Sequence, residues 1–362
     1  MNWIERIKQF AVAKPRAPKF TAEFRSRQAG KRIAVVGLGS MGMKHALILA
    51  AIGYEMRGVC DTREDRLALA HDAMPAARCH RDFHELDPSE LDVVIVATLA
   101  NSHAPIVQAL VERGFKRILL EKPVANTVED LGRIEHAANG DGVTIHVHHY
   151  RRWSPDYRRF KESARAGDLG GLKSVTCHAK SGGFGNIGTH YIDAVLYLFE
   201  RRILEAVTAD FDLSSPGSHR EGCQDPNGRC TYVLEGGVSF SLDTLVAGAA
   251  SDRQVMLRCE FERGVMEIVD SDDAWYHEDR SGQRHRHPFE IRMTTSFLQG
   301  QERARFLDAI VSDLLQPQTT PSTVFDGCRA AEAVIAAHVA SAEKRNVPLP
   351  LGGDTKTVFP FS

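Results

Sequence analysis

The chain has 362 residues, 43% of them hydrophobic and 25% charged, with a formal net charge of −2 at pH 7. This much apolar material is enough for two packed domains, and the balanced charge leaves no broad basic surface for nucleic acid or an anionic membrane. The seven cysteines are scattered without a CxxC pair, which argues against structural zinc and for a reducing compartment. No apolar run approaches the roughly 20 residues of a membrane span, so we expect a cytoplasmic protein that binds neither membrane nor nucleic acid.

The first 30 residues are basic, carry two prolines and lack the apolar core of a secretion signal. We interpret residues 1–30 as an N-terminal extension that consists of a short amphipathic turn and a loose arm. A disordered arm and a segment that makes oligomer contacts are both open interpretations.

Between residues 31 and 150, short apolar runs alternate with amphipathic stretches. The runs are IAVVG, EMRGVCD, LDVVIVAT, KRILLEKP and VTIHVHH, and the stretches between them repeat apolar residues at spacings of three and four. Apolar strands that alternate with helices predict a parallel sheet covered on both faces. We therefore expect a doubly wound Rossmann domain, an α/β fold, over residues 31–150.

The first apolar run leads into a GxGxxG motif made by Gly37, Gly39 and Gly42. In a dinucleotide site the first glycine makes the tight turn, the second lets the backbone approach the pyrophosphate, and the third lets helix and strand pack closely. The helix that starts at Ser40 and Met41 would present free N–H groups to the phosphates. The strand before the motif and the helix after it favour cofactor binding over a structural loop.

The second apolar run ends at Asp61, 24 residues after Gly37. A carboxylate there accepts hydrogen bonds from the ribose hydroxyls and repels a 2′-phosphate, so we predict NAD in preference to NADP. Arg63 keeps NADP open, because a guanidinium two residues on can receive that phosphate. The other interpretation of Arg63 is a solvated residue at a helix start.

After Pro155 the pattern changes to closely spaced candidate strands with tight turns. One helical stretch, PDYRRFKESARAG, precedes them, and two helices at 301–315 and 323–343 close the chain. The spacing predicts an antiparallel sheet over the second half. The candidate strands are LKSVTCHAK, EAVTADFDLS, RCTYVLEG, GVSFSLDTLV, RQVMLRCEF, GVMEIVD and DAWYHED.

Several segments, taken in order, resemble the Gfo/Idh/MocA family of glucose-fructose oxidoreductases, inositol dehydrogenases and related enzymes. They are the glycine motif, VATLANSHA, LLEKPVANTVEDL at 119–131, HYRRWSP at 149–155, GNIGTHYID at 185–193 and the closing TVFDGCRAAEAVIAAHVASAEKRNVPLPL. The resemblance implies that residues 151–362 form a substrate-binding and oligomerisation domain on a large, mostly antiparallel open sheet. It also implies a homodimer or homotetramer, with a sugar, cyclitol or nucleotide sugar held between the domains.

The same resemblance implies roles for residues near the cofactor. Lys122 would hydrogen-bond the reacting hydroxyl and the nicotinamide ribose region, and Glu121 would support the cofactor. Thr98 and His103 fall in the family's Thr-Pro-Asn-x-x-His segment, although this chain has Leu-Ala where Pro-Asn is usual. Independently, a lysine beside a cationic ring is a good proton acceptor, and strand ends in such sheets face the ligand crevice.

The resemblance places a proton-shuttling histidine at His190, on a helix that in many relatives carries an Asp four residues earlier. This chain has Asn186 there. An amide positions an imidazole or a hydroxyl, but it cannot neutralise an imidazolium. A lysine-led mechanism, a substrate contact at Asn186 and weakened catalysis are all open, as is a purely structural His190.

Tyr150, Arg151 and Arg152 occupy the family segment at the entry to the second domain, where side chains line the substrate pocket. Two arginines suit a carboxylate or phosphate on the substrate, or one of them forms a salt bridge at the domain interface. Asp193, three residues after His190, either orients that histidine or is a charge on the helix surface.

Five histidines elsewhere do not predict a metal site. Alternation along a strand splits His146, His148 and His149 between two faces, and no cysteine or carboxylate triplet completes a shell, so we predict no bound metal. His285 and His287 lie in SGQRHRHPF, a polar segment that predicts an exposed loop.

Together the motifs predict an NAD(P)-dependent dehydrogenase acting on CH–OH groups. It would transfer a hydride between the nicotinamide and a secondary hydroxyl or ketone of a sugar, cyclitol or nucleotide sugar. One alternative is a catalytically weakened, NAD-dependent sensor or regulatory protein of the same fold, supported only by Asn186. Another is reduction of a carbon–carbon or carbon–nitrogen bond on the same scaffold.

Overall fold

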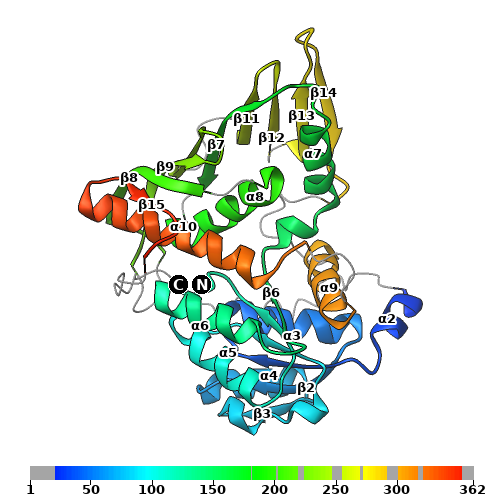
Figure 1. The fold of residues 1–362 in the computed structure, drawn as a ribbon. Coiled ribbons are helices and arrows are strands. Elements are labelled where there is room, and N and C mark those ends of the chain that lie inside the picture. The colour runs from blue at the N-terminus through cyan, green and yellow to red at the C-terminus, as the bar shows by residue number, and fades with distance from the viewer. Residues whose placement is uncertain are drawn as a thin grey trace. The chain divides into compact units, whose positions relative to one another are not determined.

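The structure is a computed structural model of the chain, and two compact units are distinguished in it (Figure 1). Unit 1 comprises Met1–Glu121, Arg133–Tyr150 and Leu298–Val324, and unit 2 comprises Lys122–Gly132, Arg151–Phe297 and Phe325–Ser362. The boundary expected after Tyr150 is one of the crossings between them. The residues that the structure describes are 21–180, 182–200, 203–218, 224–246, 255–269, 272–291, 301–316 and 321–352.

Unit 1 is built on a parallel sheet of six strands in the order β3-β2-β1-β4-β5-β6. The order reverses between β1 and β4, which is the doubly wound arrangement, so the predicted Rossmann domain is confirmed. Strand β3 was not predicted, because three residues are too few to show a period. The strands are β1 (Arg32–Val36), β2 (Glu55–Cys60), β3 (Arg78–His80), β4 (Val93–Val96), β5 (Arg117–Leu120) and β6 (Thr144–Val147).

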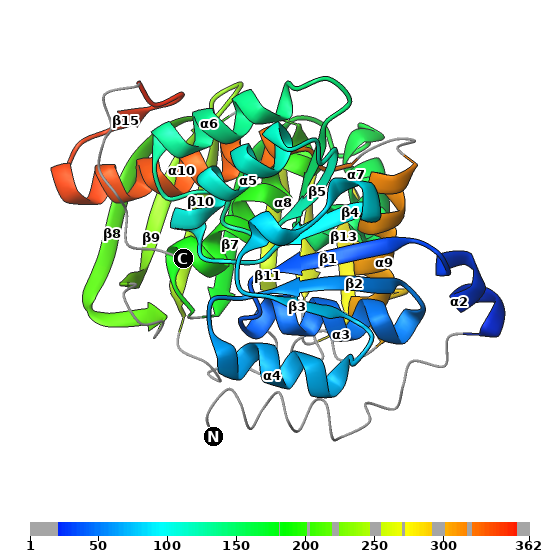
Figure 2. The same cartoon turned by 90° about the horizontal axis from the view of Figure 1, so that it is seen from below.

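Helices cover both faces of this sheet. Figure 2 shows α3 (Ser40–Ile52) and α4 (Glu64–Ala73) on one side of the strands and α5 (His103–Glu112) on the other. Helix α9 (Gln301–Leu315) contacts α3, β4, β5 and β6, so the chain returns to unit 1 near its end. The central strands are therefore buried on both faces, and every residue of β4 is buried.

The last residues of the predicted N-terminal extension form a helix. Helix α2 (Ala22–Gln28) begins at Thr21, whose hydroxyl accepts a hydrogen bond from the Phe24 amide at 3.1 Å, and Gln28 is buried. The expectation of a loose arm is therefore wrong for this part, since the cap and the contact with α3 stabilise a helix. Residues 1–20 lie outside the described part.

Unit 2 is built on a nine-stranded sheet in the order β14-β13-β12-β11-β7-β10-β9-β8-β15. The paired strands run antiparallel except β10 and β7, which are parallel, so the expected mostly antiparallel open sheet is confirmed. The strands are β7 (Leu172–Lys180), β8 (Ile203–Ser218), β9 (Asp225–Leu234), β10 (Val238–Val246), β11 (Val255–Phe261), β12 (Gly264–Val269), β13 (Ala274–Glu278), β14 (Arg284–Pro288) and β15 (Val347–Pro348).

One face of this sheet packs on helices α7 (Pro155–Arg165), α8 (Thr189–Phe199) and α10 (Val324–Glu343). The Phe160 and Trp275 rings, 5.6 Å apart, join α7 to β13. The Tyr232 hydroxyl donates to the Ala333 carbonyl at 3.0 Å and joins β9 to α10. Helix α6 (Val128–Ala138) carries the chain from residues of unit 2 back to unit 1.

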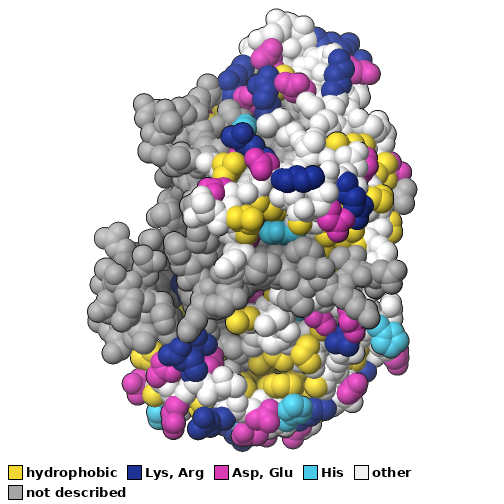
Figure 3. Space-filling view, turned by 90° about the vertical axis from the view of Figure 1, so that its left-hand side faces the viewer, with side chains coloured by type: hydrophobic (Ala, Val, Ile, Leu, Met, Phe, Trp, Pro, Cys, Tyr) yellow, Lys and Arg dark blue, Asp and Glu magenta, His cyan; other side chains and the backbone are white. Residues whose placement is uncertain are grey.

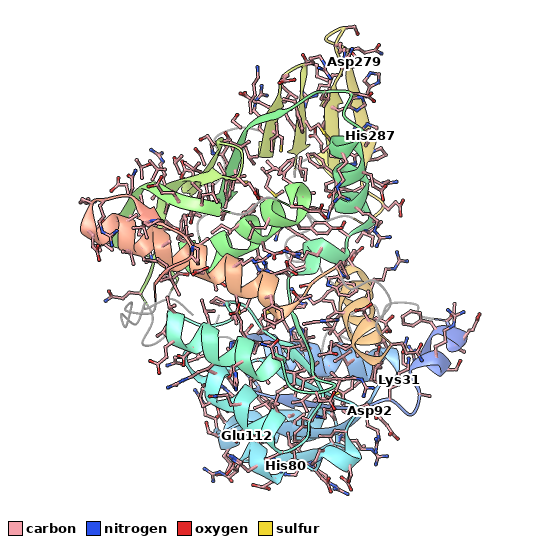
Figure 4. The ribbon with its side chains drawn as sticks, in the orientation of Figure 1. Lys31, His80, Asp92, Glu112, Asp279 and His287 are labelled. Carbon is pink, nitrogen blue, oxygen red and sulfur yellow. The ribbon has the colours of Figure 1, made fainter. Side chains whose placement is uncertain are left out.

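The segment SGQRHRHPF forms strand β14 rather than the expected loop. Figure 4 labels Asp279 and His287 on the hairpin that β13 and β14 make. The His287 ring stacks on Trp275 with ring centroids 3.7 Å apart, and both His285 and His287 are partly buried. Arginine and histidine are weak strand signals, so only pairing with β13 reveals this strand.

The described surface shows no single-sign patch in the view of Figure 3, where acidic and basic side chains are interspersed. Ion pairs such as Arg258–Glu267 and Arg229–Asp243 join side chains across neighbouring strands of the larger sheet. Among the described helices, none has both the length and the apolar character that crossing a membrane demands.

Candidate active site

The glycine motif forms a tight turn between β1 and α3. Gly37 has φ +90°, and a Cβ there would lie 2.8 Å from the Ala97 carbonyl. A Cβ on Gly42 would lie 1.8 Å from the Gly37 oxygen, so helix and turn approach as closely as predicted. A Cβ on Gly39 meets nothing within 4 Å, so the backbone at this position borders open space. The three glycines thus fit the three requirements of a pyrophosphate-binding turn.

The helix that follows can receive an anion at its first turn. Within α3, Gly39 is the N-cap and offers no side-chain acceptor, and the first turn, which includes Ser40 and Met41, carries no acidic residue. The first N–H groups of a helix lack intrahelical partners and carry partial positive charge. This end of α3 is therefore suited to a phosphate.

Asp61 follows β2 and is buried, with 6% of its surface exposed. Its Oδ2 accepts from the Leu38 amide at 2.7 Å and from Arg66 Nη1 at 3.0 Å, and its Oδ1 accepts from the Arg63 amide at 2.9 Å. The carboxylate is thus fixed beside the glycine turn. The Arg63 side chain forms an ion pair with Asp65 at 2.7 Å. The arginine whose side chain contacts Asp61 is therefore Arg66, which was not selected from the sequence.

Thr98 also borders the glycine turn, because its Cγ2 would lie 2.8 Å from a Cβ on Gly37. Its hydroxyl accepts from Ser102 Oγ at 2.9 Å, and the ring of buried His103 lies with Nε2 3.3 Å from the Thr98 carbonyl. Leu99, the next residue, is 44% exposed. The roles of Thr98 and His103 toward a cofactor stay predictions.

Glu121 is buried between two histidines that the sequence reasoning did not select. Its Oε1 lies 2.6 Å from His45 Nε2 and 2.9 Å from His148 Nδ1. Burial raises the pKa of the Glu121 carboxyl, but the interactions with His148 and His45 outweigh burial and hold that pKa well below its usual value. Burial lowers the pKa of His45 to about 4, so this ring is neutral at pH 7.

This cluster bears on the question of a metal. The ligand atoms of His45, Glu121 and His148 all lie within 4.8 Å of one another, so a carboxylate does accompany one of the strand histidines. His146 instead bonds Asp313 at 2.9 Å. The charge of buried Arg303 acts on both His45 and Glu121 and opposes a cation there. The absence of a bound metal stays a prediction.

Lys122 and Asn186, 64 positions apart, are in direct contact within unit 2. Lys122 Nζ donates to the Asn186 main-chain oxygen at 3.1 Å and also to the side-chain Oδ1. The side-chain nitrogen Nδ2 of Asn186 in turn donates to the Gly182 carbonyl at 3.2 Å. Two neutral oxygens therefore hold the lysine amine without adding a negative charge.

The expectation that Asn186 and His190 share one regular α-helix is wrong. Phe184–Gly188 forms a π-helical turn, and α8 begins only at Thr189, so His190 is its second residue. Single π-turns are frequent at functional sites. A residue distant in the chain explains the turn. Buried Asp225, which was not selected from the sequence, accepts a hydrogen bond from the main-chain N–H of Asn186 at 2.7 Å.

The residues predicted to meet the substrate are mostly engaged inside unit 2. Arg152 Nε bonds both oxygens of Asp193 at 2.8 and 3.0 Å, and both residues are buried. Burial raises the pKa of Asp193 to about 6 against the opposing charge of Arg152. Arg151 donates to the Tyr157 hydroxyl at 3.2 Å, and Tyr150 belongs to unit 1. Their roles toward a substrate stay predictions.

Comparisons with known proteins show what the chain is similar to. Residues 31–149 match the model of GFO_IDH_MocA, the oxidoreductase family with an NAD-binding Rossmann fold. The chain is therefore similar to the Gfo/Idh/MocA family over its Rossmann domain. Like Gfo/Idh/MocA proteins of known structure, it joins a parallel Rossmann sheet to a mostly antiparallel one.

Two curated relatives of this chain carry dehydrogenase names. Inositol 2-dehydrogenase 2 of Saccharopolyspora erythraea is 31% identical over 188 residues, which are 48% of this chain and 55% of the relative. The scyllo-inositol 2-dehydrogenase (NADP(+)) of Bacillus subtilis is 25% identical over 49% of this chain and 54% of the relative. The chain therefore spans about half the length of these relatives.

A solved structure matches over more of the chain. Scyllo-inositol dehydrogenase from Lactobacillus casei, with bound NAD(H) and scyllo-inositol, gives a TM-score of 0.70 at 17% identity. The match covers 88% of this chain and 98% of that one. At this identity the likeness concerns the fold alone.

Proposed function

We propose that this protein is an NAD-dependent oxidoreductase that acts on a secondary hydroxyl, or the matching ketone, of a sugar, cyclitol or nucleotide sugar. The observation that carries the proposal is the contact of Lys122 with both oxygens of Asn186. The glycine turn and the fixed carboxylate of Asp61 support the dinucleotide, and the inositol dehydrogenases among the relatives support the substrate class.

The cofactor would be held by the glycine turn, the first N–H groups of α3 and Asp61. NAD is favoured over NADP, because the Asp61 carboxylate repels a 2′-phosphate. Two observations favour NADP instead. Arg66 lies 3.0 Å from that carboxylate, and one relative has NADP(+) in its name, so binding of both dinucleotides has to be measured. Glu121 supports the cofactor as an ionised group, Thr98 borders the turn, and His103 contacts the Thr98 carbonyl.

A bound NAD would supply the acceptor for the hydride that leaves the carbon carrying the hydroxyl. Lys122 Nζ, in its neutral form, binds the hydroxyl oxygen and takes the proton that oxidation releases. Because Asn186 is neutral, it holds the amine without adding a negative charge and favours the ammonium form less than a carboxylate at this position would, which suits a mechanism led by the lysine. His190 passes the proton on.

The test is Lys122→Met, assayed on a panel of polyols and nucleotide sugars at the NADH absorbance. Turnover should fall by roughly 10² to 10⁴ while NAD binding persists, because the variant loses the proton acceptor and keeps the turn. Lys116→Met is the matched control: this exposed lysine lies at the other end of β5, where its Nζ donates to the Asp141 carbonyl.

Unchanged turnover in Lys122→Met would remove the lysine from the mechanism. A wild-type protein that binds neither dinucleotide in calorimetry would overturn the proposed function as a whole. Binding of NAD without turnover on any polyol or sugar would instead point to a sensor.

A further inference from the structure

A second set of buried polar side chains holds the π-helical turn from behind. At the start of β9, Asp225 and Asn227 are 0% and 7% exposed, and both accept main-chain amides of the segment 182–188. Asn227 Oδ1 accepts from Gly182 and Gly183 at 3.0 and 3.1 Å. The turn therefore owes its shape to side chains about forty residues further along the chain.

Asp225 makes the two closest of these contacts. Its Oδ1 accepts from the Gly185 amide and its Oδ2 from the Asn186 amide, each at 2.7 Å. Such short N–H···O distances are typical of charge-assisted hydrogen bonds, so each amide is bound more tightly than by a neutral acceptor. One of the two amides belongs to the residue whose oxygens hold Lys122.

The Asp225 carboxylate packs directly against the backbone of the turn. Gly183 has φ +90°, and a Cβ added there would lie 2.1 Å from Asp225 Oδ2. Only glycine allows both this backbone conformation and this approach. The position of the carboxylate and the path of the turn therefore depend on each other.

Resting on the proposed function, we propose that Asp225 is a positioning residue for the reaction. Its carboxylate grips the amides of Gly185 and Asn186, so that the two oxygens of Asn186 are presented to Lys122 Nζ. Asp225 acts through the turn and contacts no reacting atom. The chain thereby keeps a buried carboxylate beneath residue 186, while the side chain that holds the lysine is neutral.

The experiment compares Asp225→Asn with Asp156→Asn. Asp156 is a matched control, since it is 1% exposed in the same unit and its carboxylate accepts the main-chain amides of Glu290 and Ile291 at 3.0 and 3.2 Å. Asn at 225 keeps the shape but turns one acceptor into a donor that faces an N–H group. Both variants should lose stability, but only one should disturb the turn at Lys122.

For Asp225→Asn we expect faster hydrogen exchange at the Gly185 and Asn186 amides and a kcat lowered about tenfold or more. The dissociation constant for NAD should change less than threefold, because the glycine turn that would bind the dinucleotide is formed by residues 37–42, whereas the Asp225 carboxylate bonds the amides of Gly185 and Asn186. Asp156→Asn should keep kcat within twofold of wild type. A kcat within twofold in Asp225→Asn, despite faster exchange at those amides, would overturn the inference.

Gly183→Ala gives a second route if Asp225→Asn does not fold. The added methyl group displaces the carboxylate without removing its charge, so the same fall in kcat is expected, and the effects of the two substitutions should not add in a double variant. Additive effects, or unchanged kcat in Gly183→Ala, would contradict coupling through the turn.

Labelling of Lys122 with an amine reagent separates this inference from the proposed function. If the wild type shows no turnover, the proposed function fails, but the positioning of Lys122 is still measurable. Labelling should be several-fold faster in Asp225→Asn than in Asp156→Asn, because the amine loses its two oxygen partners. Equal rates in the two variants would overturn the inference on its own terms.

Discussion

Asp61 has its hydrogen-bonding capacity largely filled by its own chain. The Leu38 amide, the Arg63 amide and Arg66 all donate to its two oxygens at 2.7 to 3.0 Å. These bonds fix the carboxylate at the end of β2, so little side-chain freedom is lost when a ribose binds. The same side chain therefore shapes the glycine turn and, in the proposed function, selects the cofactor.

We expect Asp61→Ala to weaken NAD binding by about tenfold or more, since hydrogen bonds to a charged group are worth about 1.5–3 kcal/mol. NADP should be weakened less, because Arg66 is released to meet a 2′-phosphate. Titration with both dinucleotides measures the ratio. Asp65→Ala, which removes an exposed carboxylate paired with Arg63, is the control. Equal losses for both dinucleotides would mean a collapsed turn and not a lost selectivity contact.

At the scale of elements, the turn between β1 and α3 works because backbone atoms pass each other without side chains between them. The Gly37 amide donates to the Cys60 carbonyl at 2.7 Å, which joins the turn to β2. Helix α3 then runs against the turn over Gly42. The close packing brings the N-terminal amides of α3 to the place where phosphate is expected.

Gly42→Ala should therefore lower both stability and NAD affinity. The new methyl carbon would lie 1.8 Å from the Gly37 oxygen, so α3 must move; overpacking of this kind costs about 1–3 kcal/mol. Gly132→Ala is the control, because this exposed glycine of α6 has nothing within 4 Å of the added carbon and should gain about 0.5–1 kcal/mol as a better helix former. Thermal unfolding and NAD titration compare them. Normal NAD affinity in Gly42→Ala would refute the role of this packing.

Over the whole molecule, both units bury histidines that burial keeps neutral. His45 lies in the first unit, and His338, on α10, packs with its ring centroid 4.5 Å from that of Phe211 in the second. Burial alone lowers the pKa of His338 to about 3. An unfolded histidine titrates near pH 6.5, so below that pH the unfolded chain binds a proton that the folded chain does not.

The stability contributed at His338 is thus present above about pH 6.5 and falls as the pH drops toward 3. At pH 5 the loss is about 2 kcal/mol for this one residue. His338→Leu should flatten the decline of the urea midpoint between pH 7.5 and 5, whereas exposed His71→Leu should leave it unchanged. An identical decline in wild type and His338→Leu would show that this ring does not control acid sensitivity.

Local patterns in the sequence were enough to predict five of the six Rossmann strands with the helices between them, the mostly antiparallel second sheet and the glycine turn. Periodicity, strand length and glycine spacing are properties of neighbouring residues, so they need no knowledge of the fold. The resemblance of motifs added the choice of Lys122 and Asn186, which the structure brings into contact. It also led to an expected α-helix at 186, which is a π-turn.

Partners distant in the chain were decided only by the tertiary structure. Glu121 finds His45 and His148, Asn186 finds Asp225, and Arg152 takes Asp193 into a buried pair. Strand β14 likewise exists because β13 pairs with it. Each of these depends on which elements meet in space, and a chain of 362 residues carries no local signal for contacts of that range. The residue types of a site can therefore be selected from sequence, whereas their charge state and orientation come from the neighbours that folding supplies.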